Sequence, residues 1–216
     1  MKHAEFRAAA DAGTLISRML EERGAKADQQ VRALADALTP DVSNDVVHFL
    51  ASLHGRFPSL IDRAAERIAD IEARQWLMAA TAGFAAERQN LIRMAVAAGP
   101  IASTAGHDES DAMLPHIARA FEMLATSDRD GCAVGACIAF AADWHAIRVL
   151  LDSIAATLDI DAPTCTLPPA QDSLNLASTL ATGAARSRAM LFGADQYLAQ
   201  KQGLWALLAA RRRARL

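Results

Sequence analysis

Aromatic residues are scarce in this chain: they make up 5% of its 216 residues, although 52% of the residues are hydrophobic. Most of the hydrophobic residues are alanine and leucine, not the β-branched and aromatic types that strands favour. Alanine and leucine have the highest helix propensities. The composition therefore predicts an all-α protein, and no stretch shows the alternation expected of a strand.

Long hydrophobic runs are also missing. The longest apolar run, from Cys132 to Ala142, ends at Asp143 and falls well short of the about 20 residues of a membrane-spanning helix. The N-terminal sequence MKHAEFRAAADAG contains acidic residues and lacks the apolar region of a signal peptide. We therefore expect a soluble, cytoplasmic protein with no membrane partner.

Charge of one sign is not in large excess. The chain has 22 Lys and Arg residues against 25 Asp and Glu, a formal net charge of −3, which gives no reason to expect nucleic acid as a partner. The basic run RRRAR, from Arg211 to Arg215, stands at the end of a helical pattern, where the helix dipole favours cations. We interpret it as a solvated tail.

Cysteine is rare, and its spacing does not indicate a metal site. The three cysteines are Cys132, Cys137 and Cys165. The first two are five residues apart in a predicted helix, which places them on different faces and makes them a poor disulfide pair. Reduced, buried thiols fit a cytoplasmic protein.

Motifs for nucleotide binding, hydrolysis or metal binding are absent. The sequence contains no P-loop, no G-x-S-x-G and no H-E-x-x-H. Helical di-iron proteins use a Glu-x-x-His motif, but Glu87 is followed three residues later by Asn90. His48 and His54 are six residues apart, a poor spacing for chelation on a helix. We expect no metal and no cofactor.

Apolar residues recur at helical spacing along nearly the whole chain. Helices are expected over residues 3–23, 27–38, 42–54, 59–68, 70–98, 111–126 and 130–158, with further helical sequence over 172–213. In the last segment Gly183, Gly193 and Gly203 predict kinks or breaks, whereas Gly131 and Gly135 are expected to permit close helix packing.

These patterns predict a bundle of about seven to nine helices that forms a single domain over residues 1–216, with residues 172–216 packed on the bundle. Its size and helix count match those of heme-oxygenase-like helical oxidases. That likeness is architectural only, and no ligand set of those proteins can be placed on this sequence.

Four polar residues interrupt the apolar faces of the two long predicted helices. Glu87 lies on the buried stripe of the first, where a carboxylate needs a cation or a hydrogen-bond donor. Asp143, His145 and Arg148 interrupt the second. One intervening helix should make the two long helices parallel, which sets Glu87 level with Ile147, one residue from Arg148. We predict that these two residues pair, with His145 or Asp143 completing a cluster that is either a structural ion pair or a ligand pocket.

The turn GPIASTAGHDES, residues 99–110, holds a second candidate site. Gly99 and Pro100 end one helix, and the acidic residues suit the first turn of the next helix. His107 is not needed for either purpose. Together with Glu109 it forms a candidate loop site, and the alternative is a solvated histidine in a turn.

Two phrases of the sequence, AAERQNLIRMAVAAGPIASTAGHDES and GCAVGACIAFAADWHAIRVLLD, resemble uncharacterised all-helical proteins of alphaproteobacteria. The resemblance covers most of residues 55–160. It implies a helical fold but no activity, cofactor or site residue.

Two functions from different classes remain open. The first is a soluble, cytoplasmic, non-enzymatic helical bundle that associates with itself as a homo-oligomer. The alternative is an enzyme or a protein that binds a small ligand or metal, of heme-oxygenase-like type, with a polar pocket formed by Glu87, Asp143, His145 and Arg148. A bound metal, a coloured cofactor or an internal cavity would favour the alternative.

Overall fold

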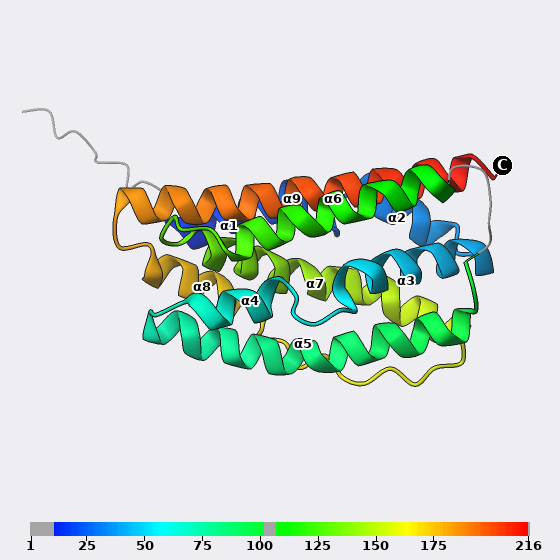
Figure 1. Ribbon diagram of the computed structural model, residues 1–216, viewed down its shortest axis with the longest axis horizontal. Helices are drawn as coiled ribbons and strands as arrows, with labels where there is room; N and C mark the ends of the chain where they lie inside the picture. The colour runs from blue at the N-terminus through cyan, green and yellow to red at the C-terminus, as the bar shows by residue number, and fades with distance from the viewer. Residues whose placement is uncertain (1–10, 102–106, 216) are drawn as a thin grey trace, which may run out of the picture.

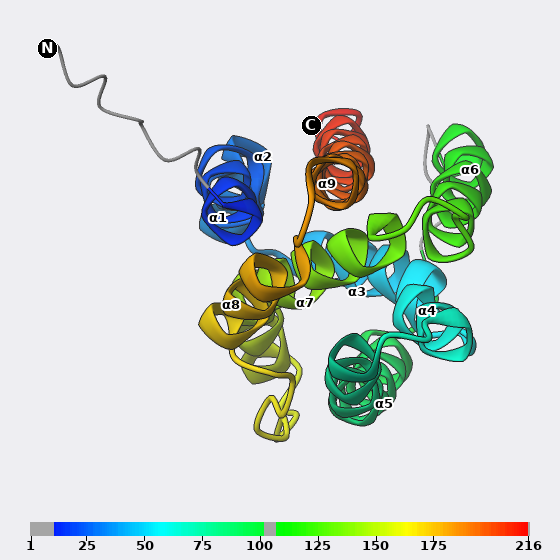
Figure 2. The same ribbon diagram turned by 90° about the vertical axis from the view of Figure 1, so that its left-hand side faces the viewer.

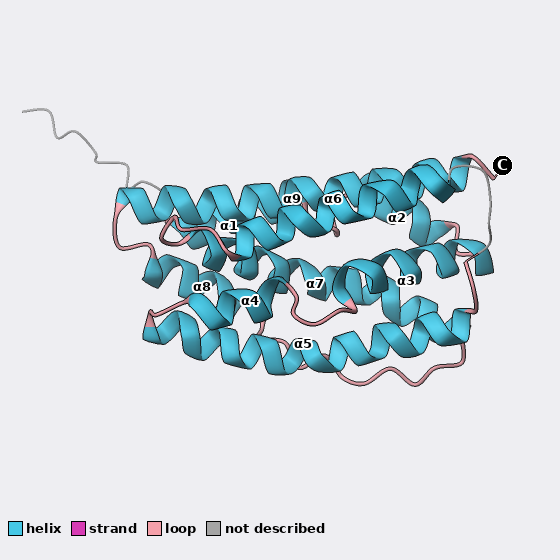
Figure 3. Ribbon diagram, in the orientation of Figure 1, coloured by secondary structure: helices cyan, strands magenta, loops and turns pink. Residues whose placement is uncertain are grey.

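The computed structural model describes residues 11–101 and 107–215, except for the side chains of residues 107–111. Within this part of the chain there are helices and loops but no strand (Figure 3), and they form one compact domain (Figure 1). The helices are α1 (Ala12–Arg23), α2 (Gln29–Asp36), α3 (Pro40–His54), α4 (Leu60–Arg67), α5 (Ile71–Ala98), α6 (His107–Ala125), α7 (Cys132–Thr157), α8 (Ala170–Leu180) and α9 (Ala184–Arg213). The predicted all-α bundle of seven to nine helices is confirmed.

Side-chain caps explain where several helices begin. Asp11, Asp28 and Asp70 accept hydrogen bonds from backbone N–H groups in the first turns of α1, α2 and α5. Thr39 does the same for α3. Each such cap satisfies a backbone donor that has no partner within its helix, and contributes about 1 kcal/mol.

Several helices differ from those expected. Helix α1 begins at Ala12, and residues 3–10 of the expected first helix lie outside the described residues. Helix α6 begins at His107 and not at residue 111, so the sequence HDES forms its first turn. Gly183 stands directly before α9, as the sequence predicts, but Gly193 and Gly203 lie inside a continuous helix of 30 residues. The expected breaks at these two glycines are wrong.

Close packing against α7 explains one of those glycines. A Cβ atom added to Gly193 would clash with the carbonyl oxygen of Cys132 in α7, and one added to Gly135 would clash with that of Met190 in α9. Each helix thus has a glycine where the backbone of the other approaches. The predicted role of Gly135 in close packing is confirmed, and Gly193 has the same role.

Helix α7 occupies the centre of the bundle, with other helices around it (Figure 2). Its residues are buried along nearly the whole length, and α9 runs beside it. In Figure 1 α5 and α7 run in the same direction, and α6, which lies between them in the sequence, runs the opposite way along the top of the picture, which is the predicted order. This arrangement sets the middle of α5 level with the middle of α7.

Helix α7 is also long and apolar enough to cross a membrane by length and composition alone. However, 83% of its most apolar window is buried by the rest of the molecule. Burial of this kind is expected of a core helix and is consistent with a soluble protein.

The C-terminal basic run is not a solvated tail, so that interpretation is wrong. The side chain of Arg211 is fully buried, and its Nε lies 2.9 Å from Asp45 Oδ1 in α3. Arg215 pairs with the same carboxylate at 2.9 Å. The apolar residues just before the run, Leu204 and Trp205, are buried within their own bundle.

Candidate functional site

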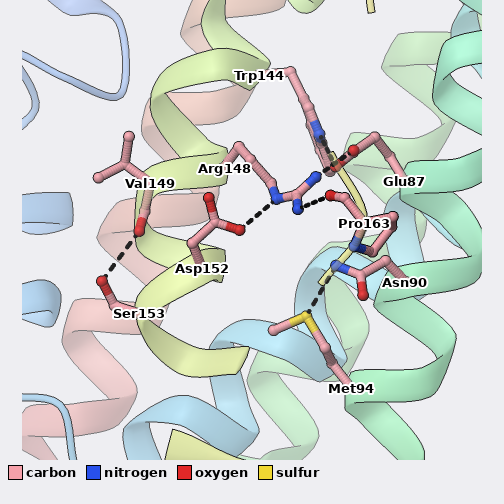
Figure 4. Close-up of polar contacts among 9 residues, drawn as sticks. All are labelled: Glu87, Asn90, Met94, Trp144, Arg148, Val149, Asp152, Ser153 and Pro163. Carbon is pink, nitrogen blue, oxygen red and sulfur yellow. Dashed lines mark hydrogen bonds and ion pairs between the residues drawn. The ribbon is translucent and has the colours of Figure 1, made fainter. Parts of the chain in front are cut away.

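Glu87 of α5 and Arg148 of α7 meet in the interior of the bundle (Figure 4). Arg148 Nη1 donates to Glu87 Oε1 at 2.5 Å, and the side chains are 7% and 1% exposed. The pairing expected from the sequence is therefore present, and it follows from the parallel alignment of the two long helices.

Further hydrogen bonds occupy the remaining polar atoms of this ion pair. Trp144 Nε1 donates to Glu87 Oε2 at 2.9 Å, and Arg148 Nε donates to Asp152 Oδ1 at 2.7 Å. Arg148 Nη2 donates to the carbonyl oxygen of Pro163 in the loop after α7. Burial alone would lower the pKa of Arg148, but the hydrogen bond and charge of Asp152 and the charge of Glu87 outweigh it and raise the pKa. Both carboxylate oxygens and all three guanidinium nitrogens thus have partners, as expected of a structural ion pair.

Neither His145 nor Asp143 completes this network, contrary to the expectation. His145 Nε2 lies 3.0 Å from the carbonyl oxygen of Pro168, and Asp143 Oδ1 accepts from the N–H of Ala25 at 2.6 Å. Residues 143 and 148 are about 140° apart around a helix, so they face different neighbours. Trp144, one turn before Arg148, takes the expected place.

The structure therefore does not gather the four residues into one pocket. Glu87 and Arg148 form one group, Asp143 belongs to another on a different face of α7, and His145 contacts the loop before α8. The loop candidates, His107 and Glu109, fall in the first turn of α6, but their side chains lie outside the described residues.

A second buried polar group, which we call the α7–α9 polar centre, surrounds Asp143. It consists of Asp143, Tyr197, Lys201 and Trp205, all of them buried. Lys201 Nζ and Trp205 Nε1 have no hydrogen-bond partner among the groups that the structure describes, and Asp143 Oδ2 and the Tyr197 hydroxyl form no bond of ordinary geometry, although each of these two residues shifts the pKa of the other. The ammonium of Lys201 lies 4.7 Å from the centre of the Trp205 ring.

Burial shifts the pKa values of this centre. It raises the pKa of Asp143 to about 6, although the N–H of Ala25 and the charge of Lys201 oppose the shift. It lowers the pKa of Lys201 to about 8. Together with the charge and hydrogen bonding of Asp143, it raises the pKa of Tyr197 well above its ordinary value. At pH 7 a carboxylate and an ammonium thus share a site without an ion pair. Polar groups in this state are ordinarily bridged by internal water.

A cleft of about 550 Å³, which we call the arginine cleft, lies between the α3–α4 turn and α6. Its lining is apolar at Leu53, Leu60 and Phe121, all of them buried. Its other residues include three arginines and one acid: Arg56, Arg63, Arg119 and Glu122. An apolar lining beside several cations is a chemistry that suits an amphipathic anion.

His54 connects this cleft to the core. The residue lines the cleft but is only 1% exposed, and its Nε2 has no partner among the described groups. Its ring stacks on Phe121 with centroids 5.7 Å apart and lies 5.3 Å from both Phe140 and Trp144. Burial, followed by the charges of Lys201 and Arg88, lowers the pKa of His54 well below 6.5. The imidazole is therefore neutral at pH 7.

Three of these buried residues, His54, Tyr197 and Lys201, were not predicted as site residues. His54 was weighed only as a metal ligand, although its positions four after Leu50 and seven after Val47 put it on a buried helical face. Tyr197, Lys201 and Trp205 recur every four residues, so helical spacing could have placed Lys201 on the apolar face of α9.

Metal binding was also tested against the geometry. Across residues 11–101 and the described side chains of 112–215, no group of three or more His, Cys, Asp or Glu side chains is placed to hold a metal ion. The three cysteines are free thiols.

The chain belongs to a family of unknown function (DUF6975), which matches residues 20–216. The expected resemblance to an uncharacterised helical family is thereby confirmed, whereas an alphaproteobacterial origin is not shown. No curated protein and no solved structure matches the chain. The architectural likeness to heme-oxygenase-like oxidases is not confirmed.

Proposed function

We propose that this protein binds a small amphipathic anion, such as an aromatic or aliphatic carboxylate, in the arginine cleft. One observation carries the proposal: a cleft of about 550 Å³ combines an apolar lining, three arginines and the buried His54, whose Nε2 has no partner among the described groups. Pockets for small ligands have volumes of about 300–1,000 Å³ and are mostly apolar with a few polar groups.

The charge of the cleft favours an anion. Arg63 lies 3.4 Å and Arg119 lies 3.0 Å from the carboxylate of Glu122, so both depend on one acid. Arg56 forms no ion pair within the described part of the chain. One carboxylate cannot neutralise three guanidinium groups, and arginine suits the planar, bidentate recognition of a carboxylate.

The lining and His54 favour a ligand with an apolar body. Leu53, Leu60 and Phe121 offer hydrophobic contact at the inner side of the cleft. Because His54 is neutral, its imidazole can donate or accept one hydrogen bond without the cost of a buried charge. A molecule with an aromatic or alkyl body and one acidic group would use both parts of the cleft.

The proposal describes binding without a chemical step, in the cytoplasm. The thiols of Cys132, Cys137 and Cys165 support that location, because free cysteines suit a reducing compartment. The Glu87–Arg148 pair does not support a ligand role, since its polar atoms are already bonded to the protein.

A matched pair of probes tests the proposal. Purified protein labelled with ¹⁵N is titrated with 2-naphthoate and with the neutral 2-naphthalenemethanol, and backbone amide shifts are followed by NMR. We expect naphthoate to shift the amides of residues 52–63 and 114–122, and to bind at least about ten-fold more tightly than the alcohol.

Charge reversal at the cleft supplies the control. Arg56→Glu and Arg119→Glu should each weaken naphthoate binding at least about five-fold, whereas Arg213→Glu, an exposed arginine in the last turn of α9, should leave it unchanged. Equal binding of the two probes, or shifts confined to other helices, would overturn the proposal.

A further inference from the structure

Helix α5 exposes a second apolar face that the bundle does not cover. Its inner face packs into the core through residues such as Leu77 and Phe84. Its outer face leaves four large hydrophobic side chains exposed, namely Ile71 at 73%, Met78 at 63%, Ile92 at 48% and Val96 at 78%. A helix that is apolar on two sides needs a second neighbour.

The spacing of this outer face is that of a two-helix seam. Intervals of four and three residues alternate along it without interruption, as at the core positions of a coiled coil. We call it the α5 stripe, and it consists of Ile71, Gln75, Met78, Ala82, Ala85, Gln89, Ile92 and Val96. None of these side chains is charged, and the small alanines at the middle allow another helix to approach closely.

Charged residues beside the α5 stripe indicate which helix packs against it. Glu72 and Arg93 stand on the same edge, each one position after a stripe residue, near opposite ends of the helix. Both are exposed, and Arg93 makes one hydrogen bond, to the carbonyl oxygen of Asp161 at 3.2 Å. A second copy of α5 that runs antiparallel would bring Glu72 against the partner's Arg93 and Arg93 against the partner's Glu72.

A parallel pairing would not satisfy these charges. It would set each residue of this edge beside the opposite edge of the partner helix, so that Arg93 faces a second arginine, Arg88 of the partner subunit, and Glu72 has no partner within α5. On the opposite edge Arg74 would face Ala95 of the partner subunit in the antiparallel arrangement, with no ion pair to make or break.

We propose that the α5 stripe is the interface of a homodimer, in which the α5 helices of two copies pack antiparallel about a two-fold axis. The interface is isologous, since the same residues contribute from both copies. One helix per subunit makes an interface at the small end of those that are stable in solution. The dimer is therefore reversible and dissociates on dilution.

The test measures mass against concentration, by sedimentation velocity from the low micromolar to the high micromolar range. The wild type should pass from monomer to dimer. Met78→Glu should raise the dissociation constant at least about 30-fold, because it places a charge in the seam. Its helical circular dichroism and melting temperature verify that the exposed substitution leaves the fold intact.

Charge exchange distinguishes the antiparallel seam from any other contact. Glu72→Arg and Arg93→Glu should each raise the dissociation constant about ten-fold, and the double variant should return it to within about three-fold of the wild type. Arg74→Glu, the same reversal on the other edge, should leave it unchanged. A wild type that stays monomeric, a dimer that tolerates Met78→Glu, or a double variant without recovery would each overturn the proposal.

Discussion

Trp144 Nε1 donates a hydrogen bond to Glu87 Oε2 at 2.9 Å, so an indole and the guanidinium of Arg148 bind the two oxygens of one buried carboxylate. This relationship fixes the position of α5 on α7, because the carboxylate comes from one helix and both donors come from the other. Removal of the Glu87 carboxylate would therefore leave two buried donors, Trp144 Nε1 and Arg148 Nη1, without an acceptor.

We expect Glu87→Ala to lower the free energy of unfolding by about 3–5 kcal/mol, because it leaves a buried cation without its partner. Replacing the pair with apolar residues, Glu87→Leu with Arg148→Met, should recover much of this loss. Urea denaturation measures both. The control is Asp152→Ala, whose side chain is 53% exposed and which should cost less than about 1 kcal/mol. A loss below about 1 kcal/mol for Glu87→Ala would contradict the prediction.

Two glycines of α9 provide a matched pair of substitutions. Gly193→Ala should destabilise the protein by about 1–3 kcal/mol or more, because its Cβ meets the backbone of α7. Gly203→Ala has open space around its Cβ and should stabilise the protein by about 0.5–1 kcal/mol, the usual gain in a helix interior. Thermal unfolding of the two variants measures the difference. Equal effects would show that α7 and α9 are not in backbone contact at Gly193.

The C-terminal arginines differ in burial, so replacing them should change the free energy of unfolding by different amounts. Arg211→Ala removes a fully buried guanidinium from Asp45, and we expect a loss of about 1–3 kcal/mol, because the buried carboxylate keeps only Arg215 as its cation. Arg213→Ala, two residues on and exposed, should change stability by less than about 0.5 kcal/mol. Chemical denaturation of both variants is the measurement. Equal free energies of unfolding for the two variants would indicate that the basic run is a solvated tail after all.

Hydrophobic periodicity predicted the fold well because each helix buries one face in a common core. It located the long helices α5 and α7 to within a few residues, and their parallel order brought Glu87 level with Arg148. It failed at Gly193 because the propensity of glycine was weighed without the neighbour that requires a residue lacking Cβ.

The candidate sites were harder to predict, because they depend on which faces meet. Asp143 was singled out correctly as buried, but its neighbours Tyr197 and Lys201 lie more than 50 residues away on α9. The arginine cleft joins residues of the α3–α4 turn to residues of α6. Arg56 in an exposed turn and Arg119 on the polar side of α6 carry no hydrophobic periodicity, so only the packed structure brings them into one lining.

Loss of the last two helices should expose the core. Helix α9 runs along α7, and a chain that ends after Pro169 lacks the side chains of Met190, Tyr197 and Trp205, all of them buried. We expect the truncated protein to aggregate, because the apolar surface of α7 would then face water. Size-exclusion chromatography with light scattering measures this. A monodisperse fragment with an unchanged melting temperature would contradict the prediction.

Asp143 should make stability depend on pH in the direction opposite to that of an ordinary ion-paired carboxylate. Burial raises its pKa from 3.8 to about 6, so between these values the folded state binds a proton that the unfolded state releases. The free energy of unfolding therefore rises as the pH falls from about 6 to about 4, by at most about 3 kcal/mol at about 1.4 kcal/mol per pKa unit.

Asp143→Asn removes this titration, so the stability of the wild type minus that of the variant isolates it from the other carboxylates. Urea unfolding at half-unit steps from pH 4 to pH 7 should show the difference growing toward acid. A flat difference, or one that grows toward neutral pH, would show that Asp143 has a partner that keeps it ionised.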